Sequence, residues 1–346
     1  MRLRLPRLSD VDRLFRKQRL ERTLTRALPR LPESPIRVRV TGGPDNILVH
    51  RFRLRKDGRC ILLEFDHRHI LWDHRMFQVY RERAGLLTDL FARTAPGVIE
   101  ARAEISDGSS SGDGWISFSS PHPEAILIPD SDFVGSLGYA GIRRIALGPG
   151  PAWQDRVAGF CWRGSTTGLG IISTPGMEAD DPSLIQRTRL CLSGRDIPDA
   201  DFKLSRVVQS HDAKDPERVA RAGILAESIG SASWRARKFA LDVDGNSNAW
   251  SNLFTRLLLG CCVVKVGSPR GFRQWYYDQL VPFESFVPVR ADLSDLGERL
   301  EWCRTHDREC RAIAAAGQAL ALRLTLESER AAAVERINRA FAVRAS

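Results

Sequence analysis

The stretch Cys161-Trp162-Arg163-Gly164-Ser165-Thr166-Thr167-Gly168 ends an apolar run that begins at Ala158. The apolar residues predict a buried strand, and the small polar residues after them predict a turn. Backbone N–H groups, hydroxyls and one guanidinium at such a turn suit a diphosphate. We therefore expect a phosphate site there, formed by Arg163, Gly164, Ser165 and Thr166.

A second junction of this kind extends from Lys238 to Trp250. Residues 240–243 predict a strand and residues 244–247 a turn, after which a helix is expected as far as residue 259. The N-terminus of that helix would favour a phosphate, although Asn246-Ser247 is also typical of a plain helix cap. The residues expected to shape a nucleotide pocket are Lys238, Asp244, Gly245, Asn246, Ser247 and Trp250, with Lys265 on the next strand as a further cation.

Short apolar runs and longer amphipathic segments alternate from residue 158 onward. We expect strands at 158–162, 205–209, 239–243, 261–266 and 286–289. We expect helices at 183–192, 216–227, 247–259, 272–280, 293–304, 307–324 and 327–343. This alternation predicts an α/β fold with parallel sheets that helices cover on both faces.

The segment Gly148-Pro-Gly-Pro-Ala-Trp153 is the best candidate for a domain boundary. We expect four parts: a basic amphipathic helix at 1–35, a Rossmann-like N-terminal domain at 36–148, a Rossmann-like C-terminal domain at 149–325 and a C-terminal helix at 326–346. A ligand would then bind between the two domains, at the carboxyl ends of the strands.

The composition describes a basic protein of 346 residues with a formal net charge of +10. This charge suits nucleic acid, anionic lipid or phosphorylated substrates, or is simply a solvated surface. No apolar run is long enough to span a membrane, so we expect a cytoplasmic protein. The arginine-rich helix at 1–35 either lies on an anionic membrane surface or packs on its own domain. The 7 cysteines include no CxxC pair, which indicates buried free thiols rather than a zinc ribbon.

Two Asp-x-Asp pairs invite a catalytic or metal-binding role: Asp130 with Asp132, and Asp242 with Asp244. Such pairs bind Mn²⁺ or Mg²⁺ in some transferases. Asp130 also follows an apolar strand, which makes it a candidate general base, with Asp132 as its competitor and helix capping as the alternative. Arg273, beside the aromatic segment 275–277, would help stack on a sugar or base unless that segment is a buried helix.

Taken together, the motifs of this chain resemble glycosyltransferase family 90, which includes protein O-glucosyltransferases and bacterial lipopolysaccharide or capsule transferases. The resemblance is ordered and covers 126–324. The matching segments are Ile128-Pro-Asp130, Trp153, Phe160–Ser165, Lys238–Gly245, Leu257–Val266, Trp275–Pro282, Phe286–Leu296, Trp302 and Ala312–Gln318.

The resemblance implies a GT-B-like fold and an inverting, metal-independent transfer from a UDP-sugar. It implies that Asp130 is the base, that Arg163 and Ser165 hold the diphosphate, and that Lys238 and the turn at 245–250 shape the nucleotide pocket. The N-terminal domain would then bind the acceptor and the C-terminal domain the nucleotide sugar. No cofactor is expected beyond the UDP-sugar.

Two departures from the family pattern leave the specificity open. Ser251-Asn252 stands where protein-directed members carry an arginine, and Ser285 stands where they carry a histidine. We therefore expect a bacterial-type enzyme whose acceptor is a glycan or glycolipid precursor, peripheral on the inner face of the cell membrane, with no nucleic-acid partner. A metal-dependent transferase and a non-catalytic basic module that binds anionic lipid or nucleic acid remain the alternatives.

Overall fold

The computed structural model describes residues 37–42, 51–58, 60–65, 74–108 and 114–342, together with helical positions 15, 18, 19, 21 and 22. The expected helix at 1–35 lies outside the described residues apart from those five positions. The chain divides into two compact units, which are described separately. The first comprises Met1–Val134 and Leu326–Ser346, and the second comprises Gly135–Thr325.

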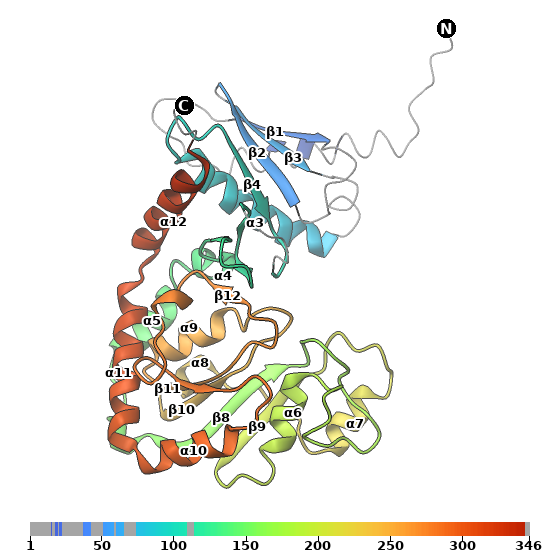
Figure 1. Cartoon of the computed structure of the whole chain (residues 1–346), viewed down its shortest axis with the longest axis vertical. Coiled ribbons are helices and arrows are strands. Elements are labelled where there is room, and N and C mark those ends of the chain that lie inside the picture. The colour runs from blue at the N-terminus through green and yellow to red at the C-terminus, as the bar shows by residue number, and fades with distance from the viewer. Residues whose placement is uncertain are drawn as a thin grey trace. The chain divides into compact units, whose positions relative to one another are not determined.

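In the described residues of the first unit, six strands form a mixed sheet in the order β1-β3-β2-β4-β5-β7, of which Figure 1 labels β1 to β4. Its strands are β1 (Arg37–Gly42), β2 (Arg51–Asp57), β3 (Cys60–Phe65), β4 (Glu100–Glu104), β5 (Ile116–Ser117) and β7 (Ile126–Leu127); β6 (Ser119–Ser120) lies outside this sheet. Strand β2 runs antiparallel to both of its neighbours, while the other pairs are parallel. The sheet is therefore mixed, and departs from the Rossmann-like pattern expected at 36–148.

The helices of the first unit come from both ends of the chain. They are α3 (His74–Ala92) and α12 (Leu326–Phe341), with the short α4 (Ser131–Gly135) at the boundary with the second unit. Helix α12 is fixed to the unit by a hydrogen bond of 2.8 Å from the Ala95 N–H to Asn338 Oδ1. Arg336 of α12 also donates to the Leu127 carbonyl. The expected C-terminal helix is thus a part of the N-terminal unit rather than a separate part of the chain.

The second unit contains a five-stranded, fully parallel sheet in the order β13-β11-β10-β8-β9. Its strands are β8 (Val157–Ser165), β9 (Ala200–Arg206), β10 (Arg237–Asp242), β11 (Cys262–Val266) and β13 (Val287–Val289). Every residue of β11 is buried, as expected for a central parallel strand that is covered on both faces. The α/β class predicted from the alternating pattern is confirmed.

Helices and short elements complete the second unit. The helices are α5 (Ala140–Leu147), α6 (Gln186–Ser193), α7 (Asp215–Arg221), α8 (Ser231–Trp234), α9 (Ser251–Leu258), α10 (Leu296–Thr305) and α11 (Asp307–Arg323), and the short elements are η1 (Trp153–Asp155), β12 (Arg273–Gln274) and η2 (Tyr277–Gln279). The expected helix at 272–280 is wrong, because Trp275 and Tyr276 are buried by edge-on aromatic contacts instead of forming one face of a helix.

The boundary between the units falls at Val134/Gly135 rather than at the expected 148/149. The reason is α5, which belongs to the second unit. Arg143 of α5 donates to the Ala321 and Leu322 carbonyls at the end of α11. Arg235 donates to the carbonyls of Gly148 and Pro149, so the Gly-Pro segment is fixed on the second unit and does not link two domains.

None of the helices in the described residues combines the length and the apolar character needed to cross a bilayer. The core of the second unit is apolar and aromatic, with Phe160 stacked on Phe239 at a centroid distance of 4.6 Å. This core fixes the strand ends, and therefore the loops that follow them.

Candidate nucleotide-binding site

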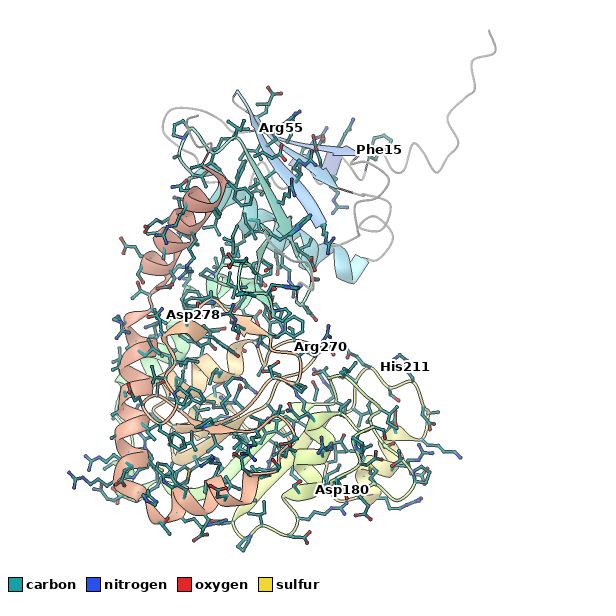
Figure 2. All side chains as sticks on the ribbon, viewed as in Figure 1. Phe15, Arg55, Asp180, His211, Arg270 and Asp278 are labelled. Carbon is teal, nitrogen blue, oxygen red and sulfur yellow. The ribbon has the colours of Figure 1, made fainter. Side chains whose placement is uncertain are left out.

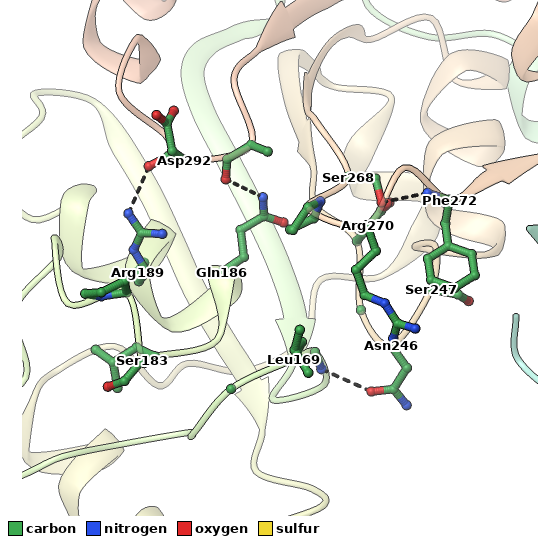
Figure 3. A pocket seen from close by; sticks show the side chains of 18 residues that line it. Leu169, Ser183, Gln186, Arg189, Asn246, Ser247, Ser268, Arg270, Phe272 and Asp292 are labelled. Atoms are coloured by element: carbon green, nitrogen blue, oxygen red, sulfur yellow. Dashed lines mark hydrogen bonds between the residues drawn. The ribbon is translucent and has the colours of Figure 1, made fainter. Parts of the chain in front are cut away.

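A cavity of about 500 Å³ lies at the carboxyl ends of the parallel strands of the second unit (Figure 3). Ligands of open parallel sheets bind at this edge, since the loops that leave the strands converge there. The lining residues are Gly168, Leu169 and Gly170 after β8, Asp244–Ser247 after β10, Ser268, Pro269, Arg270 and Phe272 after β11, Ala291 and Asp292 after β13, and Pro182, Ser183, Leu184, Gln186 and Arg189 around the start of α6.

The loops after β8 and β10 touch each other closely, and glycine makes the approach possible. A Cβ atom on Gly245 would lie 2.5 Å from Thr167 Oγ1. Gly170 has a φ of +123°, and a Cβ atom there would lie 2.6 Å from the Ser183 carbonyl oxygen. The Gly168 N–H donates to Asn246 Oδ1 at 3.1 Å. The two loops therefore form one continuous wall of the cavity.

Arg187, in the first turn of α6, holds the two loops together from behind. Its guanidinium donates to the carbonyls of Val243 and Asp244 after β10, each at 3.0 Å. It also donates to the Ser165 carbonyl at 3.0 Å and to Thr167 Oγ1 at 2.6 Å. Arg187 is buried, so these four hydrogen bonds are shielded from water. The sequence analysis did not predict this role of Arg187. It could have been noticed because a cation is unusual in the first turn of a helix, where the helix dipole disfavours positive charge.

A buried lysine forms ion pairs with both carboxylates of the second Asp-x-Asp pair. Lys265 Nζ lies 2.9 Å from Asp242 Oδ2 and 3.3 Å from Asp244 Oδ1. Burial works to lower the pKa of Lys265, but the charges of the two carboxylates outweigh it and raise that pKa above its usual value. The ammonium group therefore stays charged between the two carboxylates.

Four of the residues predicted for the nucleotide pocket line the cavity: Asp244, Gly245, Asn246 and Ser247. All four come from the junction after β10. The expected helix begins at Ser251 rather than at residue 247, so these residues lie in the loop and not in the first turn. Trp250 occupies the position before α9 with a φ of 49° and does not line the cavity. Lys265 acts on the cavity through Asp244.

Arg163, which the first junction predicted as a diphosphate ligand, does not line the cavity. Residues alternate across a strand, so Arg163 faces the side of the sheet opposite to Trp162, whose ring lies under Arg187 of α6. Arg163 Nη2 donates to both carboxylate oxygens of Asp201 on β9, at 2.8 and 2.9 Å, and Nε donates to the Glu227 carbonyl. Its guanidinium stabilises the β8–β9 edge.

The other residues of the first junction are also engaged within the fold. A Cβ atom on Gly164 would lie 2.5 Å from the Trp162 indole. The Ser165 carbonyl accepts from Arg187, and Thr166 Oγ1 donates to the Val208 carbonyl at 2.7 Å. None of these residues lines the cavity, which the chain reaches only at Gly168.

Lys238 and Arg273 lie outside the cavity as well. Lys238 is at the amino end of β10, opposite to the strand end that faces the cavity, and its ammonium lies 2.7 Å from Asp307 Oδ1. Arg273 forms an ion pair with Asp278 at 2.9 Å. Lys238 therefore does not line this cavity, and its contribution to a nucleotide pocket stays a prediction.

Asp130 belongs to the first unit and is buried. Its Oδ1 accepts a hydrogen bond from the Phe133 N–H at 2.9 Å, which is the capping role considered as the alternative. Burial raises the pKa of its carboxyl to about 6, while the Phe133 hydrogen bond opposes that shift. Asp132 is exposed. Among the described residues no group of three or more His, Cys, Asp or Glu side chains is arranged to hold a metal ion.

The cavity residues that the sequence did not predict follow β8, β11 and β13 or lie around the start of α6. Gln186 joins two of these loops, since its Nε2 donates to the carbonyls of Gly267 and Ala291 at 3.0 and 2.7 Å. Arg189 donates to the Asp292 carbonyl at 2.9 Å. The loops after β11 and β13 could have been predicted from their positions, since each follows a predicted strand and therefore reaches the same edge of the sheet.

The family model of glycosyl transferase family 90 matches residues 186–331. Among curated proteins, the chain is 34% identical to the uncharacterised protein 035R of Invertebrate iridescent virus 3, over 47% of this chain and 14% of that protein. It is 33% identical to protein O-glucosyltransferase 2 of Danio rerio, over 29% of this chain and 19% of that protein. The chain thus spans less than a fifth of the length of these relatives.

Two solved structures are similar at low sequence identity. Anabaena HepE in complex with UDP and glucose is 12% identical, with a TM-score of 0.32, over 62% of this chain and 52% of that one. The α,α-trehalose 6-phosphate synthase of Burkholderia multivorans is 11% identical, with a TM-score of 0.37, over 87% and 91%.

The match and the cavity coincide along the sequence. The matched residues 186–331 include Gln186, Arg189 and all the cavity residues that follow β10, β11 and β13. The part of this chain that forms most of the cavity is therefore similar to glycosyl transferase family 90.

Proposed function

We propose that this chain is a glycosyltransferase that binds a UDP-sugar in the cavity of the second unit and transfers the sugar to a hydroxyl acceptor. The observation that carries the proposal is the coincidence of the family match, residues 186–331, with a cavity at the carboxyl ends of a parallel sheet. Such cavities suit nucleotides, because backbone N–H groups and polar loop residues converge there.

The proposed reaction is an inverting displacement. The acceptor oxygen attacks C1 of the sugar, the bond between C1 and the diphosphate oxygen breaks, and UDP leaves with the electron pair. A base takes the proton of the acceptor hydroxyl, and we assign this role to Asp130. A carboxyl with a pKa of about 6 is largely ionised at neutral pH and is still basic enough to accept a proton.

The ion pairs of Lys265 support a transfer that does not use the second Asp-x-Asp pair for a metal ion. We propose a metal-independent reaction, in which positive groups of the protein offset the charge that develops on the diphosphate. The net charge of +10 supports an anionic acceptor, for which we propose a bacterial lipopolysaccharide, capsule or glycolipid precursor at the membrane surface.

The experiment that tests the function is a thermal-shift comparison of UDP, ADP and GDP. A ligand that binds only the folded chain at about 100 times its Kd stabilises it by about 2.7 kcal/mol. We expect UDP to raise the unfolding temperature by several degrees and the other two nucleotides to have little effect. Equal shifts, or none, would contradict a UDP site. Transfer that EDTA abolishes and Mn²⁺ restores would favour the metal-dependent alternative.

The variant Asp130→Asn tests the assignment of the base. Asparagine keeps the helix cap but cannot accept the proton, so we expect transfer to fall by about 10²-fold or more while UDP still stabilises the chain. The pKa of Asp130 is about 6 in the folded chain, above its ordinary value of 3.8, so its ionisation destabilises the fold as pH rises through this interval.

The Asp130→Asn substitution should therefore lower the transfer activity but raise the stability of the chain. At pH 7 the Asp130→Asn variant should be more stable than the parent chain, by up to about 3 kcal/mol, and the difference should shrink toward pH 4. Unfolding measured at several pH values checks this. Full transfer activity in Asp130→Asn would contradict the assignment, and a lower stability at every pH would show that the carboxyl serves the fold instead.

A further inference from the structure

Arg163, the cation predicted to bind the diphosphate, does not line the cavity. We infer that Arg270, in the loop after β11, contacts the diphosphate of the bound nucleotide (Figure 2). The inference rests on the proposed function, since it assumes that the cavity binds a nucleotide. It adds a residue that the sequence did not single out.

Two cations line the cavity, Arg189 and Arg270. The guanidinium of Arg189 is already committed, because it donates to the Ala179 carbonyl at 3.1 Å and to the Asp292 carbonyl at 2.9 Å. Arg270 is exposed, and within the part of the chain that the structure describes it forms no hydrogen bond and no ion pair. Its five N–H donors are available to a ligand.

Arg270 is nevertheless held in place. Its Cζ atom lies 4.9 Å from the centroid of the Phe272 ring, within the range of a cation–π contact. Phe272 is buried, and its backbone N–H donates to Ser268 Oγ at 3.0 Å, so the ring has a fixed position. A guanidinium that stacks through its face keeps its edge free, and the edge matches phosphate oxygens bidentately.

The other charged residues of the cavity also favour binding of the phosphates at the end where Arg270 lies. The Asp244 charge is offset only in part by Lys265, which Asp244 shares with Asp242. Asp292 remains an anion, since hydrogen bonds from Ser294 lower the pKa of its carboxyl. Figure 3 shows Asp292 with Arg189 on one side of the cavity and Arg270 with Asn246 on the other. The charges of Asp292 and Arg189 oppose each other on the first side, whereas Arg270 on the second side is not paired with an acid among the described residues, so a diphosphate is attracted more strongly to the second side.

The test compares UDP with uridine, which carries no phosphate, by calorimetric titration of the full chain. In the variant Arg270→Gln we expect the Kd for UDP to rise about tenfold or more, as for the loss of a charge-assisted hydrogen bond, and the Kd for uridine to change less than twofold. Arg270→Lys keeps the charge without the fork and should fall between. Arg308→Gln is the matched control, since Arg308 is exposed and lies on α11 outside the cavity.

Each outcome has one meaning. If the parent chain binds UDP and Arg270→Gln binds it equally well, the inference fails and the proposed function stands. If Arg270→Gln weakens uridine as much as UDP, the side chain supports the cavity wall and does not contact the diphosphate, which also overturns the inference. If the parent chain does not bind UDP, the proposed function itself fails.

Discussion

The junctions after β8 and β10 have similar sequences but different positions in the fold. Both follow a buried strand with small polar residues and a nearby cation. After β10 the loop turns directly into the cavity, whereas after β8 the chain is occupied by contacts with β9 until Gly168. The difference teaches that two turns of similar composition reach different surroundings, because only the turn after β8 is occupied by its neighbouring strand.

The largest expected effect concerns the β10 junction, in the variant Lys265→Met. Removing one partner of a buried ion pair costs about 3–5 kcal/mol, because Asp242 and Asp244 would stay buried without a cation. Burial raises the pKa of Asp244 and Lys265 opposes that rise, so the variant should raise it further. The loss of stability should therefore be greater at pH 8 than at pH 5 in denaturant unfolding.

The double variant Lys265→Met/Asp244→Asn provides the control, since it removes one of the two uncompensated charges. It should recover part of the lost stability at pH 8. A Lys265→Met chain that is as stable as the parent would contradict the view that this ion pair supports the β10 junction.

The second effect tests whether Arg187 joins the two junctions. In Arg187→Leu, three carbonyl oxygens and the Thr167 hydroxyl lose their donor, and we expect a total cost of about 2–4 kcal/mol, since acceptors in loops at a cavity can regain water. We expect the unfolding temperature to drop by more than about 6 °C. Arg189→Leu, which removes two hydrogen bonds to carbonyls, should cost less. Equal losses in the two variants would show that Arg187 has no special role.

The third effect tests how closely the junctions approach. A methyl group at Gly245 would lie 2.5 Å from Thr167 Oγ1, so Gly245→Ala must separate the two loops at a cost of about 1–3 kcal/mol. The double variant Gly245→Ala/Thr167→Ala removes the obstructing hydroxyl. Its loss of stability should be smaller than the sum of the losses in the two single variants. Strict additivity in this cycle would contradict the contact.

The smallest effect is expected at the β8 junction. Arg163→Gln removes the ion pair with Asp201, whose carboxylate is partly exposed, together with hydrogen bonds to carbonyl oxygens at the sheet edge, so the fold should lose about 1–2 kcal/mol. Its Kd for UDP should stay within twofold of the parent value, in contrast to Arg270→Gln. A tenfold weaker affinity for UDP in Arg163→Gln, measured by the same titration, would return Arg163 to the site.

The features that could be predicted from the sequence are those that depend on the local pattern of apolar and polar residues. The alternating elements, the parallel sheet and the loop at 244–247 follow from apolar period and turn composition, and all appear in the structure. The role of Arg163 did not follow, because it depends on β9 pairing with β8 and bringing Asp201 alongside. Lys238 does not line the cavity for a simpler reason, since it lies at the amino end of its strand.

Other features depend on contacts between distant segments. Arg187 joins loops that lie more than fifty residues apart from one another in the sequence, and no local pattern marks that role. Helix α12 belongs to the first unit because it contacts residues in the first third of the chain. One such contact is the hydrogen bond from the Ala95 N–H to Asn338 Oδ1. The helix expected at 272–280 failed because burial of its aromatic residues does not require a helical period.

A crystal structure of the chain with bound UDP tests most directly which junction forms the site. We predict density for the nucleotide in the cavity, against the loop at 244–247, with its phosphates beside Arg270. Density for the phosphates against Arg163, Ser165 and Thr166, with Asp201 displaced from its ion pair, would contradict this result.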